Sequence, residues 1–254
     1  MNVRLLQISD CHLFTDPATL LRGIATWSRF QQLVAELPNV APAPDLLLVT
    51  GDTAHDELLT TYQAARKVLD PWESRLRIIP GNHDHRESIL ATFPNGCRRV
   101  QDRFNFAEQF ERWQVIGLDT HLPGSTSGRL DREQLDWLST HLTATRELWT
   151  VIVMHHPPLL VQSPWLDAIG LEDRDDFAEI VRAHGHVRLI LCGHIHQAYV
   201  GSLGHATVLT TPAVGPQFRP RTEKLEIIDL PPALRLVDLQ DSGQWSSQVI
   251  LADK

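Results

Sequence analysis

The chain has 254 residues, of which 43% are hydrophobic and 21% charged, and its 31 acidic and 23 basic residues give a formal net charge of −8. This composition excludes a disordered, a collagenous and a disulfide-built protein, and the acidic balance argues against a general nucleic-acid surface. The 13 histidines are the unusual feature, because imidazole is a common metal ligand and proton-transfer group. Their positions in the sequence are therefore the first question.

Short apolar runs alternate with amphipathic stretches along most of the chain. We expect β-strands at Val3–Ser9, Leu46–Thr50, Leu76–Pro80, Val115–Asp119, Thr150–His155, Val187–Cys192, Thr207–Thr211 and Leu225–Leu230. The amphipathic stretches predict helices at Trp27–Leu37, Leu58–Asp70, Arg86–Phe93, Arg132–Leu142 and Asp175–His184. Several strand runs are almost continuously apolar, which is typical of strands covered on both faces. The alternation favours an α/β fold.

The ends of the predicted elements add detail. Asp131 is the expected N-cap of the fourth helix, with Gln134 three residues later in the capping-box position. The tail, Ala206–Leu251, offers four short strand-like runs and no helix, so we expect a meander or a second sheet there. We find no repeat and no interdomain linker, and we expect one domain over residues 1–254.

Neither the apolar runs nor the cysteines indicate a membrane or a secreted protein. The longest apolar runs, such as Leu46–Val49 and Val151–Met154, are far shorter than the ~18 residues of a spanning helix. No secretory signal opens the sequence. Cys11, Cys97 and Cys192 form no Cys-x-x-Cys pair, so we expect reduced thiols and a cytoplasmic protein.

Polar residues gather where five of the predicted strands end. The residues that these five loops present are Asp10, His12, Asp52, Asn82, His83, His155, His156, His194 and His196. In open α/β sheets, ligands bind beyond the carboxyl ends of the strands. Asp10 and His12 are two residues apart and can face one point in extended backbone, as can His194 and His196. Gly51 and Gly81 precede polar residues and permit sharp turns or close backbone approach.

Each motif alone has an ordinary structural alternative. Asp-x-His and Gly-Asp are usually turns, and Gly-Asn-His-Asp can be a loop with side chain–backbone hydrogen bonds. Gly-His-x-His after a buried strand is more specific, and all five motifs in one order rarely coincide by chance. Carboxylate, amide and imidazole donors suit Mn²⁺, Fe²⁺, Zn²⁺ or Co²⁺. The set is too large for one tetrahedral ion, and two ions bridged by a carboxylate fit it better.

The ordered set Asp-x-His, Gly-Asp, Gly-Asn-His-Asp, His and Gly-His-x-His resembles the calcineurin-like metallophosphoesterase superfamily. Within it, the chain is most similar to the bacterial class III cyclic-nucleotide phosphodiesterases, which include enzymes acting on 3′,5′-cyclic AMP. The segments that carry this closer similarity are Leu5–Phe14, Leu118–Leu138, Ser163–Asp167, Leu191–Gln197 and Gln217–Pro220. The similarity spans nearly the whole chain.

The resemblance implies a fold and a set of site residues. The implied fold is a four-layer α/β/β/α sandwich of two mixed sheets flanked by helices. The implied metal ligands are Asp10, His12 and His196 for one ion, Asn82, His155 and His194 for the other, and Asp52 as the bridge. His83 is the implied catalytic residue and faces the phosphate together with Asn82. The two ions are expected to be Fe²⁺ or Mn²⁺, with Zn²⁺ or Co²⁺ as alternatives.

The expected reaction is hydrolysis of 3′,5′-cyclic AMP to 5′-AMP by in-line attack of a metal-bound hydroxide. Two alternatives stay open: a broad phosphodiesterase for glycerophosphodiesters, 2′,3′-cyclic nucleotides or other small diesters, and a non-catalytic metal-binding scaffold. We expect a small-molecule substrate and neither a nucleic acid nor a membrane as partner. The sequence leaves the oligomeric state open.

Residues beyond the motifs give further candidates for substrate contact. The candidates for base stacking or phosphate contact are Trp165, Phe218, Arg219, His121 and Arg129, and each could equally be core or solvated surface. Asp84 could orient His83, or it could be a turn or helix-cap residue. We expect His155 rather than His156 to be the ligand, because it is the first histidine after the strand.

Overall fold

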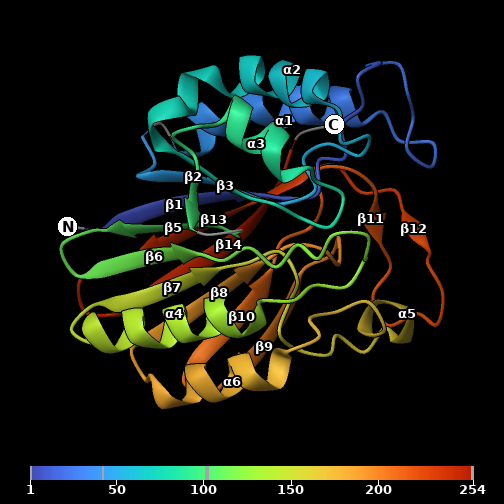
Figure 1. Cartoon of the computed structure of the whole chain (residues 1–254). Helices are drawn as coiled ribbons and strands as arrows, with labels where there is room; N and C mark the ends of the chain where they lie inside the picture. The colour runs from blue at the N-terminus through green and yellow to red at the C-terminus, as the bar shows by residue number, and fades with distance from the viewer. Residues whose placement is uncertain (1, 42, 101–102, 253–254) are drawn as a thin grey trace.

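Two β-sheets packed face to face form the centre of the protein, in a computed structural model that describes residues 2–41, 43–100 and 103–252. The first sheet has the strand order β14-β13-β1-β2-β3 (Figure 1). Its strands are β1 (Val3–Ile8), β2 (Leu46–Thr50), β3 (Leu76–Ile79), β13 (Ala233–Leu239) and β14 (Trp245–Leu251). Strands β1, β2 and β3 are parallel, whereas β13 and β14 are antiparallel to their neighbours. The first sheet is therefore mixed.

The second sheet has the order β4-β5-β6-β7-β8-β10-β9. Its strands are β4 (Arg98–Val100), β5 (Arg103–Gln109), β6 (Trp113–Gly117), β7 (Trp149–Val153), β8 (Val187–Cys192), β9 (Tyr199–Leu203) and β10 (Ala206–Thr210). Strands β6, β7, β8 and β10 are parallel, and β5 and β9 run antiparallel at the two sides. A short antiparallel pair stands apart, formed by β11 (Gln217–Phe218) and β12 (Ile227–Ile228).

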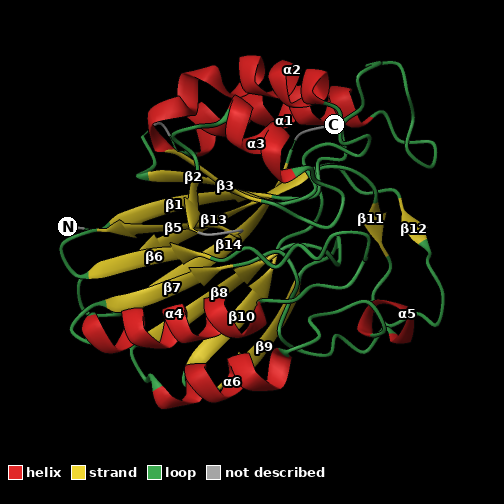
Figure 2. Ribbon diagram, viewed as in Figure 1, coloured by secondary structure: helices red, strands yellow, loops and turns green. Residues whose placement is uncertain are grey.

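Helices cover both outer faces of the paired sheets. Figure 2 shows α1, α2 and α3 against the first sheet and α4 and α6 against the second. Their bounds are α1 (Thr26–Val40), α2 (Leu59–Leu69), α3 (Arg86–Thr92), α4 (Asp131–Ala144) and α6 (Arg174–Ala183). A 3₁₀ helix (Asp70–Arg75) follows α2, and the one-turn helix α5 (Pro164–Asp167) lies beside β11 and β12. This arrangement confirms the predicted four-layer α/β/β/α sandwich.

Three buried apolar layers hold these elements together. Between the sheets, Leu48 of β2 and Val151 of β7 belong to one cluster of buried side chains. Phe30 of α1 belongs to a second cluster on the outside of the first sheet, and Leu138 of α4 to a third on the outside of the second. Because both faces of the central strands are covered, their sequences are nearly continuous apolar runs.

The carboxyl ends of the parallel strands of both sheets meet at one end of the sandwich. The backbone N–H of Asp10, after β1, donates to Gly51 O after β2 at 3.1 Å. The N–H of Gly193, after β8, donates to the carbonyl oxygen of His155 after β7 at 3.0 Å. The ring of His155 in turn reaches Thr50 O, in the other sheet, at 2.8 Å. The two sets of polar loops therefore form one site.

Some predicted boundaries were wrong. The strand expected at Val115–Asp119 runs instead over Trp113–Gly117. Asp119 lies beyond the end of this strand, and its carboxylate binds the guanidinium of Arg86. The strand expected at Leu225–Leu230 is reduced to Ile227–Ile228. The strands β4, β5 and β9 and the helix α5 were not predicted, because their segments are polar or short.

The N-terminus of α4 bears out half of the predicted capping box. Asp131 Oδ1 accepts the backbone N–H of Gln134 at 3.0 Å, although Asp131 is itself the first helical residue. The side chain of Gln134 does not accept the N–H of Asp131, which donates to Asp173, although its Nε2 does donate to Leu130 O at the start of the helix at 2.9 Å. Its Oε1 accepts the N–H of Asp119 at 2.9 Å and its Nε2 donates to Asp119 O at 2.8 Å. Gln134 therefore ties α4 to the loop after β6.

No helix within the described ranges is long and apolar enough to cross a membrane. The three cysteines, Cys11, Cys97 and Cys192, are free and buried.

Candidate metal centre

Left-handed backbone marks the loops that carry the predicted ligands. Five of the non-glycine residues with positive φ belong to the motifs, with φ between 49° and 70°: Asp10, His12, Asp52, His194 and His196. This conformation is disfavoured for side chains with a Cβ and costs about 1–3 kcal/mol per residue. The chain bends sharply after three of the site's strands, β1, β2 and β8, and these five residues are half of the described non-glycine residues with positive φ.

Gly51 and Gly81 allow two of these loops to touch. A Cβ on Gly51, whose φ is +93°, would collide with the ring of His155 and lie 2.7 Å from Gly81 N. A Cβ on Gly81 would collide with the carboxylate of Asp52. The loops after β2 and β3 can approach this closely only because both positions are glycine.

One group of ligand atoms comes from Asp10, His12, Asp52 and His196, all of which are buried. His12 Nε2 lies 3.0 Å from His196 Nε2 and 3.5 Å from Asp52 Oδ2. His196 Nε2 lies 3.5 Å from Asp10 Oδ1. The ring Nδ1 of His196 faces Pro216 O at 2.6 Å. Since a carbonyl oxygen can only accept, the proton of neutral His196 sits on Nδ1, and its Nε2 lone pair points at the group.

A second group comes from the other sheet and the loop after β3. His155 donates its Nδ1–H to Thr50 O at 2.8 Å, so Nε2 is the ring nitrogen that faces the site. That buried Nε2 has no hydrogen-bond partner in the part of the chain that the structure describes. His194 faces Ile169 O with Nε2 at 3.1 Å and Asn82 Oδ1 with Nδ1 at 3.0 Å. An unpartnered buried nitrogen costs free energy, and a bound cation would satisfy it.

The carboxylate of Asp52 stands between the two groups. Its Oδ2 lies 3.5 Å from His12 Nε2 and 3.5 Å from His155 Nε2, one imidazole on each side. Its Oδ1 accepts the backbone N–H of His83 at 2.8 Å. One carboxylate oxygen facing ligand atoms of both groups is the arrangement that a bridge between two cations requires.

Burial and neighbouring charges set the protonation of the buried groups. Burial holds the pKa of His12 well below its usual range and lowers the pKa of His194 to about 3, so both rings are neutral. Burial alone would raise the pKa of Asp52, but the imidazoles of His155 and His12 hold this pKa well below its usual range. Burial would lower the pKa of His155, but Asp52 and Asp10 raise it to about 9, so without a metal ion this ring is a cation paired with Asp52. A divalent cation would take the place of the proton on Nε2, and the resulting set of carboxylate oxygen and imidazole nitrogens suits such an ion.

Asp84 braces the backbone and does not orient the ring of His83. Its Oδ1 accepts the N–H of Thr53 at 3.0 Å and the hydroxyl of Tyr62 at 2.9 Å. Its Oδ2 accepts the N–H of Gly81 at 2.9 Å. Burial, followed by the charge of Asp52, raises the pKa of Asp84 to about 6. The turn-residue alternative for Asp84 is therefore the correct one.

His156 has partners at both ring nitrogens. Its Nδ1 lies 2.8 Å from Thr120 Oγ1 and its Nε2 lies 3.2 Å from Thr126 O. Its ring centroid is nevertheless only 4.3 Å from that of His194. These contacts place His156 beside His194 and occupy both of its ring nitrogens. By contrast, Nε2 of the preceding His155 has no hydrogen-bond partner among the described residues.

A cavity of about 420 Å³ opens onto both ligand groups, and His83 and His55 line it. Its apolar wall comes from the segment around α5 and from the strand β11, and it includes Trp165 and Phe218. The Phe218 ring stacks on the His196 ring, with centroids 4.1 Å apart and planes 5° apart. Trp165 packs edge-on against Phe218 at 5.3 Å. Two of the five substrate-contact candidates therefore lie at the site.

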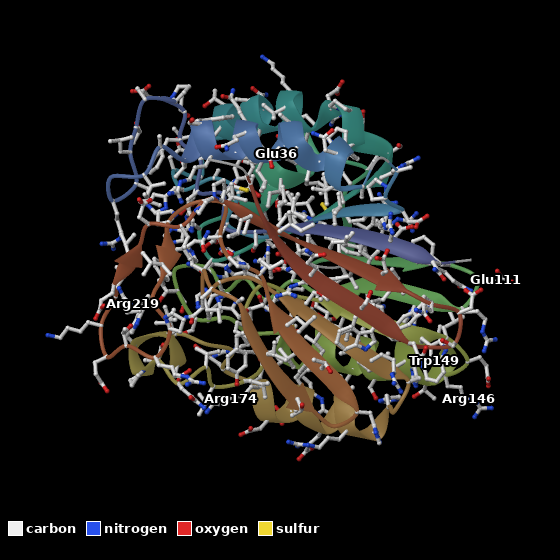
Figure 3. All side chains as sticks on the ribbon, turned by 180° about the vertical axis from the view of Figure 1, so that it is seen from behind. Glu36, Glu111, Arg146, Trp149, Arg174 and Arg219 are labelled. Carbon is white, nitrogen blue, oxygen red and sulfur yellow. The ribbon has the colours of Figure 1, made fainter. Side chains whose placement is uncertain are left out.

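The other three substrate-contact candidates do not line this cavity, so for them the alternative of a structural or surface role holds. Arg219 pairs with Glu226 at 3.0 Å, and Figure 3 shows Arg219 at the edge of the molecule. Arg129 pairs with Glu172 on the surface. His121 is held elsewhere, with its carbonyl oxygen accepting from Arg86 and Arg103.

The sequence analysis gave His55 no role, yet its ring lies inside the site. His55 Nδ1 is 3.1 Å from His12 Nδ1, and the rings of His55 and His83 stack with centroids 4.5 Å apart and planes 25° apart. Burial, followed by His83, lowers the pKa of His55. The one signal in the sequence was the position of His55, three residues after Asp52.

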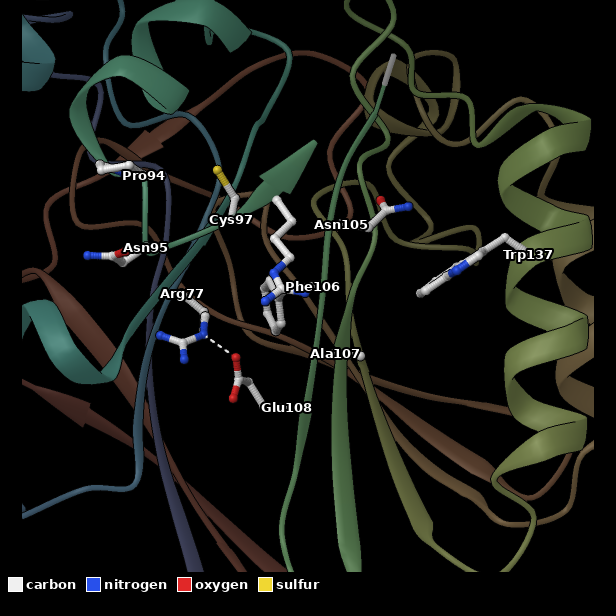
Figure 4. Close-up of a pocket in the computed structure, with 10 residues that line it drawn as sticks. Arg77, Pro94, Asn95, Cys97, Asn105, Phe106, Ala107, Glu108 and Trp137 are labelled. Atoms are coloured by element: carbon white, nitrogen blue, oxygen red, sulfur yellow. Dashed lines mark hydrogen bonds and ion pairs between the residues drawn. The ribbon is translucent and has the colours of Figure 1, made fainter. Parts of the chain in front are cut away.

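A larger cavity of about 680 Å³ lies between β3, β5 and α4 (Figure 4). Arg77 and Glu108 face each other there and form an ion pair of 2.6 Å, and Trp137 lines the opposite side. This cavity contains none of the motif residues. Size alone does not identify a functional site, because convergent polar groups must also be present.

Comparison with known proteins decides the family. The model for calcineurin-like phosphoesterases matches residues 3–198. The chain belongs to the calcineurin-like phosphoesterase family. Among members of this family, the chain is 34% identical over 253 residues to a probable cyclic nucleotide phosphodiesterase of Synechococcus sp., covering 100% of this chain and 94% of that protein. It is 34% identical over 251 residues to the 3′,5′-cyclic adenosine monophosphate phosphodiesterase CpdA of Vibrio vulnificus, covering 98% and 89%.

A solved structure supports the same calcineurin-like phosphoesterase fold. A dimetal phosphatase from Danio rerio superposes with a TM-score of 0.70, covers 99% of both chains and is 14% identical. At this identity the match concerns the fold. The family match and the His and Asp groups described above identify a metallophosphoesterase with candidate ligands for two metal ions.

Proposed function

We propose that this protein hydrolyses 3′,5′-cyclic AMP to 5′-AMP with two divalent metal ions. The central observation is Asp52, whose single oxygen Oδ2 lies 3.5 Å from an imidazole of each ligand group. The substrate assignment rests on relatives of 34% identity that cover nearly the whole chain and are named for cyclic nucleotides. A phosphodiester anion repels nucleophiles, and paired cations overcome that repulsion.

The donor sets suggest how the ions are held. In this proposal, Asp10, His12 and His196 hold one ion, Asn82, His155 and His194 hold the other, and Asp52 bridges them. Bound ions would acidify water and neutralise phosphate charge. We propose Fe²⁺ or Mn²⁺, with Zn²⁺ or Co²⁺ as alternatives, since mixed oxygen and nitrogen donors suit all four ions.

His83 is the proposed catalytic residue. Its ring lines the cavity, while its backbone N–H donates to Asp52 Oδ1 at 2.8 Å. It is thereby fixed beside the proposed bridge without being one of the ligands. From there, a protonated ring can stabilise the phosphate oxygens or donate its proton to the leaving 3′-oxygen. The amide of Asn82, from the same loop, is positioned to contact the phosphate as well as its ion.

The apolar wall of the cavity suits a nucleobase. The indole of Trp165 and the ring of Phe218 meet edge to face, and aromatic surfaces of this kind stack favourably on bases. The indole Nε1 of Trp165 is buried and has no hydrogen-bond partner among the described residues. It is available to donate to an acceptor on the substrate.

Two further proposals concern the whole chain. The C-terminal strand β13 pairs with the N-terminal strand β1, with Val3 opposite Leu239, which supports one domain over residues 1–254. The cysteines are free and buried, which supports a reducing compartment, and we propose the cytoplasm.

The variant His83→Ala tests the mechanism. We expect it to retain two metal ions per chain and to lower kcat for 3′,5′-cyclic AMP by about 10²–10⁴-fold. Removal of the ions from the parent protein by a chelator should abolish hydrolysis, and added Mn²⁺ should restore it. Full activity in His83→Ala would remove His83 from the mechanism.

The same assays test the alternative functions. Hydrolysis of glycerophosphodiesters in preference to the cyclic nucleotide would favour the broad phosphodiesterase, and two bound ions without any hydrolysis would favour a scaffold.

A further inference from the structure

His55 contacts two proposed functional residues through two different kinds of interaction. Its Nδ1 lies 3.1 Å from Nδ1 of His12, and its ring stacks on that of His83 with centroids 4.5 Å apart. The ring of Phe14 packs on His55 as well, at 5.0 Å. His55 is therefore held between the first ligand group and the proposed catalytic histidine.

The hydrogen bond between His12 and His55 has a direction. Two ring nitrogens at 3.1 Å share one proton, so one of them donates and the other accepts. If His12 presents Nε2 to a cation, its single proton sits on Nδ1 and must be donated to His55. His55 then accepts at Nδ1 and keeps its own proton on Nε2. An acceptor behind a metal-binding imidazole fixes its tautomer and ring orientation.

The stacking between His55 and His83 affects the orientation of the His83 ring. Among the described residues, the ring of His83 makes no hydrogen bond, and its side-chain contacts with other rings are those with His12 at 5.1 Å and His55 at 4.5 Å. The backbone of His83 is fixed by Asp52, but its side-chain torsions are not. The nearly parallel face of His55 limits the directions in which the His83 ring can point.

We propose that His55 is a positioning residue with two separable tasks: its Nδ1 fixes the tautomer of His12, and its ring face orients His83. This inference rests on the proposed function, because it assumes that His12 holds a metal ion and that His83 acts on the phosphate. The two tasks can be removed one at a time.

Two variants of His55 separate these tasks. His55→Asn keeps an acceptor oxygen near the position of Nδ1 and removes the ring. His55→Phe keeps an aromatic face and removes the acceptor. The matched control is His141→Phe, because His141 is also half-buried, makes one hydrogen bond at 3.0 Å to Gln114 and stacks on Trp137 at 24°, away from the site.

The readouts are the affinity for Mn²⁺, measured by calorimetric titration of chelator-treated protein, and kcat and KM at saturating Mn²⁺. We expect His55→Phe to weaken Mn²⁺ binding about 10–100-fold at one of two sites and to lower kcat less than His55→Asn does. His55→Asn should bind Mn²⁺ within about threefold of the parent protein and lose about tenfold in kcat, with a smaller change in KM. His141→Phe should change neither readout.

Several outcomes would overturn the proposal. A merely structural role predicts that both variants lose metal affinity and kcat together. Unchanged Mn²⁺ affinity in His55→Phe would remove the tautomer task, and unchanged kcat in His55→Asn would remove the orienting task. Three Mn²⁺ ions per parent chain would show that His12, His55 and His83 form a metal site of their own. The affinity measurement needs no substrate, so it still tests His55 if 3′,5′-cyclic AMP proves not to be hydrolysed.

Discussion

The ring of His155 donates its Nδ1–H to the carbonyl oxygen of Thr50 at 2.8 Å, which joins the loop after β7 in one sheet to the end of β2 in the other. This contact leaves Nε2 of His155 buried and without a hydrogen-bond partner among the described residues, 3.5 Å from the carboxylate of Asp52. His156, the next residue, has partners at both nitrogens. Two adjacent histidines therefore have opposite capacities to bind a cation.

The pair His155 and His156 gives the first prediction. His155→Gln should reduce the metal content from two ions to about one per chain, because one ligand group loses its unpartnered nitrogen. His156→Gln should retain two ions, since its hydrogen bonds are structural. Elemental analysis of the purified variants measures the content. Equal metal loss in both variants would contradict the assignment.

The wall of the cavity gives the second prediction. Trp165→Ala should raise KM for 3′,5′-cyclic AMP by about 5–100-fold, because base stacking on an aromatic ring contributes about 1–3 kcal/mol. Arg219→Ala is the control, since Arg219 adjoins Phe218 in sequence but pairs with Glu226 outside the cavity. Steady-state kinetics on both variants decides this, and a KM that rises in the control and not in Trp165→Ala would refute it.

The brace at Asp84 gives the third prediction. The hydroxyl of Tyr62 donates to Asp84 Oδ1 at 2.9 Å and accepts the N–H of His85 at 2.8 Å. Tyr62→Phe leaves that N–H without its acceptor, so the free energy of unfolding should fall by about 1–2 kcal/mol. The metal content should stay at two ions, because other donors still hold Asp84. Urea unfolding followed by circular dichroism measures the loss, and an unchanged midpoint would contradict it.

His121 gives the fourth prediction, which concerns pH. Burial, followed by the charge of Arg86, lowers the pKa of His121 to about 4, and its buried Nδ1 has no partner among the described residues. The unfolded chain binds this proton near pH 6.5, so it carries more protons than the folded chain between pH 6.5 and 4. Folding stability therefore falls as the pH falls through this window.

The size of this effect can be isolated in a variant. Allowing for partial exposure of the ring, His121 should account for about 1–2 kcal/mol of the stability lost between pH 7 and pH 5. In His121→Gln that part of the loss should disappear. Unfolding free energies of the parent and the variant at the two pH values measure it. The same loss in both proteins would show that His121 does not titrate as described.

The site was predictable because its residues directly follow apolar strands. The run before Asp10 identifies β1 and the run before His194 identifies β8, and the carboxyl ends of parallel strands meet at one edge. Nothing local in the sequence indicates that β13 pairs with β1, with Val3 opposite Leu239. That pairing joins residues more than 200 positions apart and depends on tertiary packing.

The parts of the site that were not predicted depend on contacts in the folded chain. Arg129 and Arg219 carry the positive charge that a phosphate contact requires. Arg129 is paired with Glu172, which is distant in sequence, and Arg219 is paired with the nearby Glu226. His55 was overlooked because its meaning lies in contacts with His12 and His83, which come from other loops. A sequence shows which residue types are present, whereas the ion pairs and contacts of the folded chain decide which side chains can still bind a substrate.

We propose above that this family member is a two-metal 3′,5′-cyclic AMP phosphodiesterase. The most direct test is hydrolysis by anaerobically purified protein of known metal content, with 3′,5′-cyclic AMP compared with glycerophosphodiesters and 2′,3′-cyclic nucleotides by kcat/KM. We expect two ions per chain, 5′-AMP as the product, the highest kcat/KM for 3′,5′-cyclic AMP, and loss of activity on chelation. A higher kcat/KM for another diester, or hydrolysis that survives complete metal removal, would contradict it.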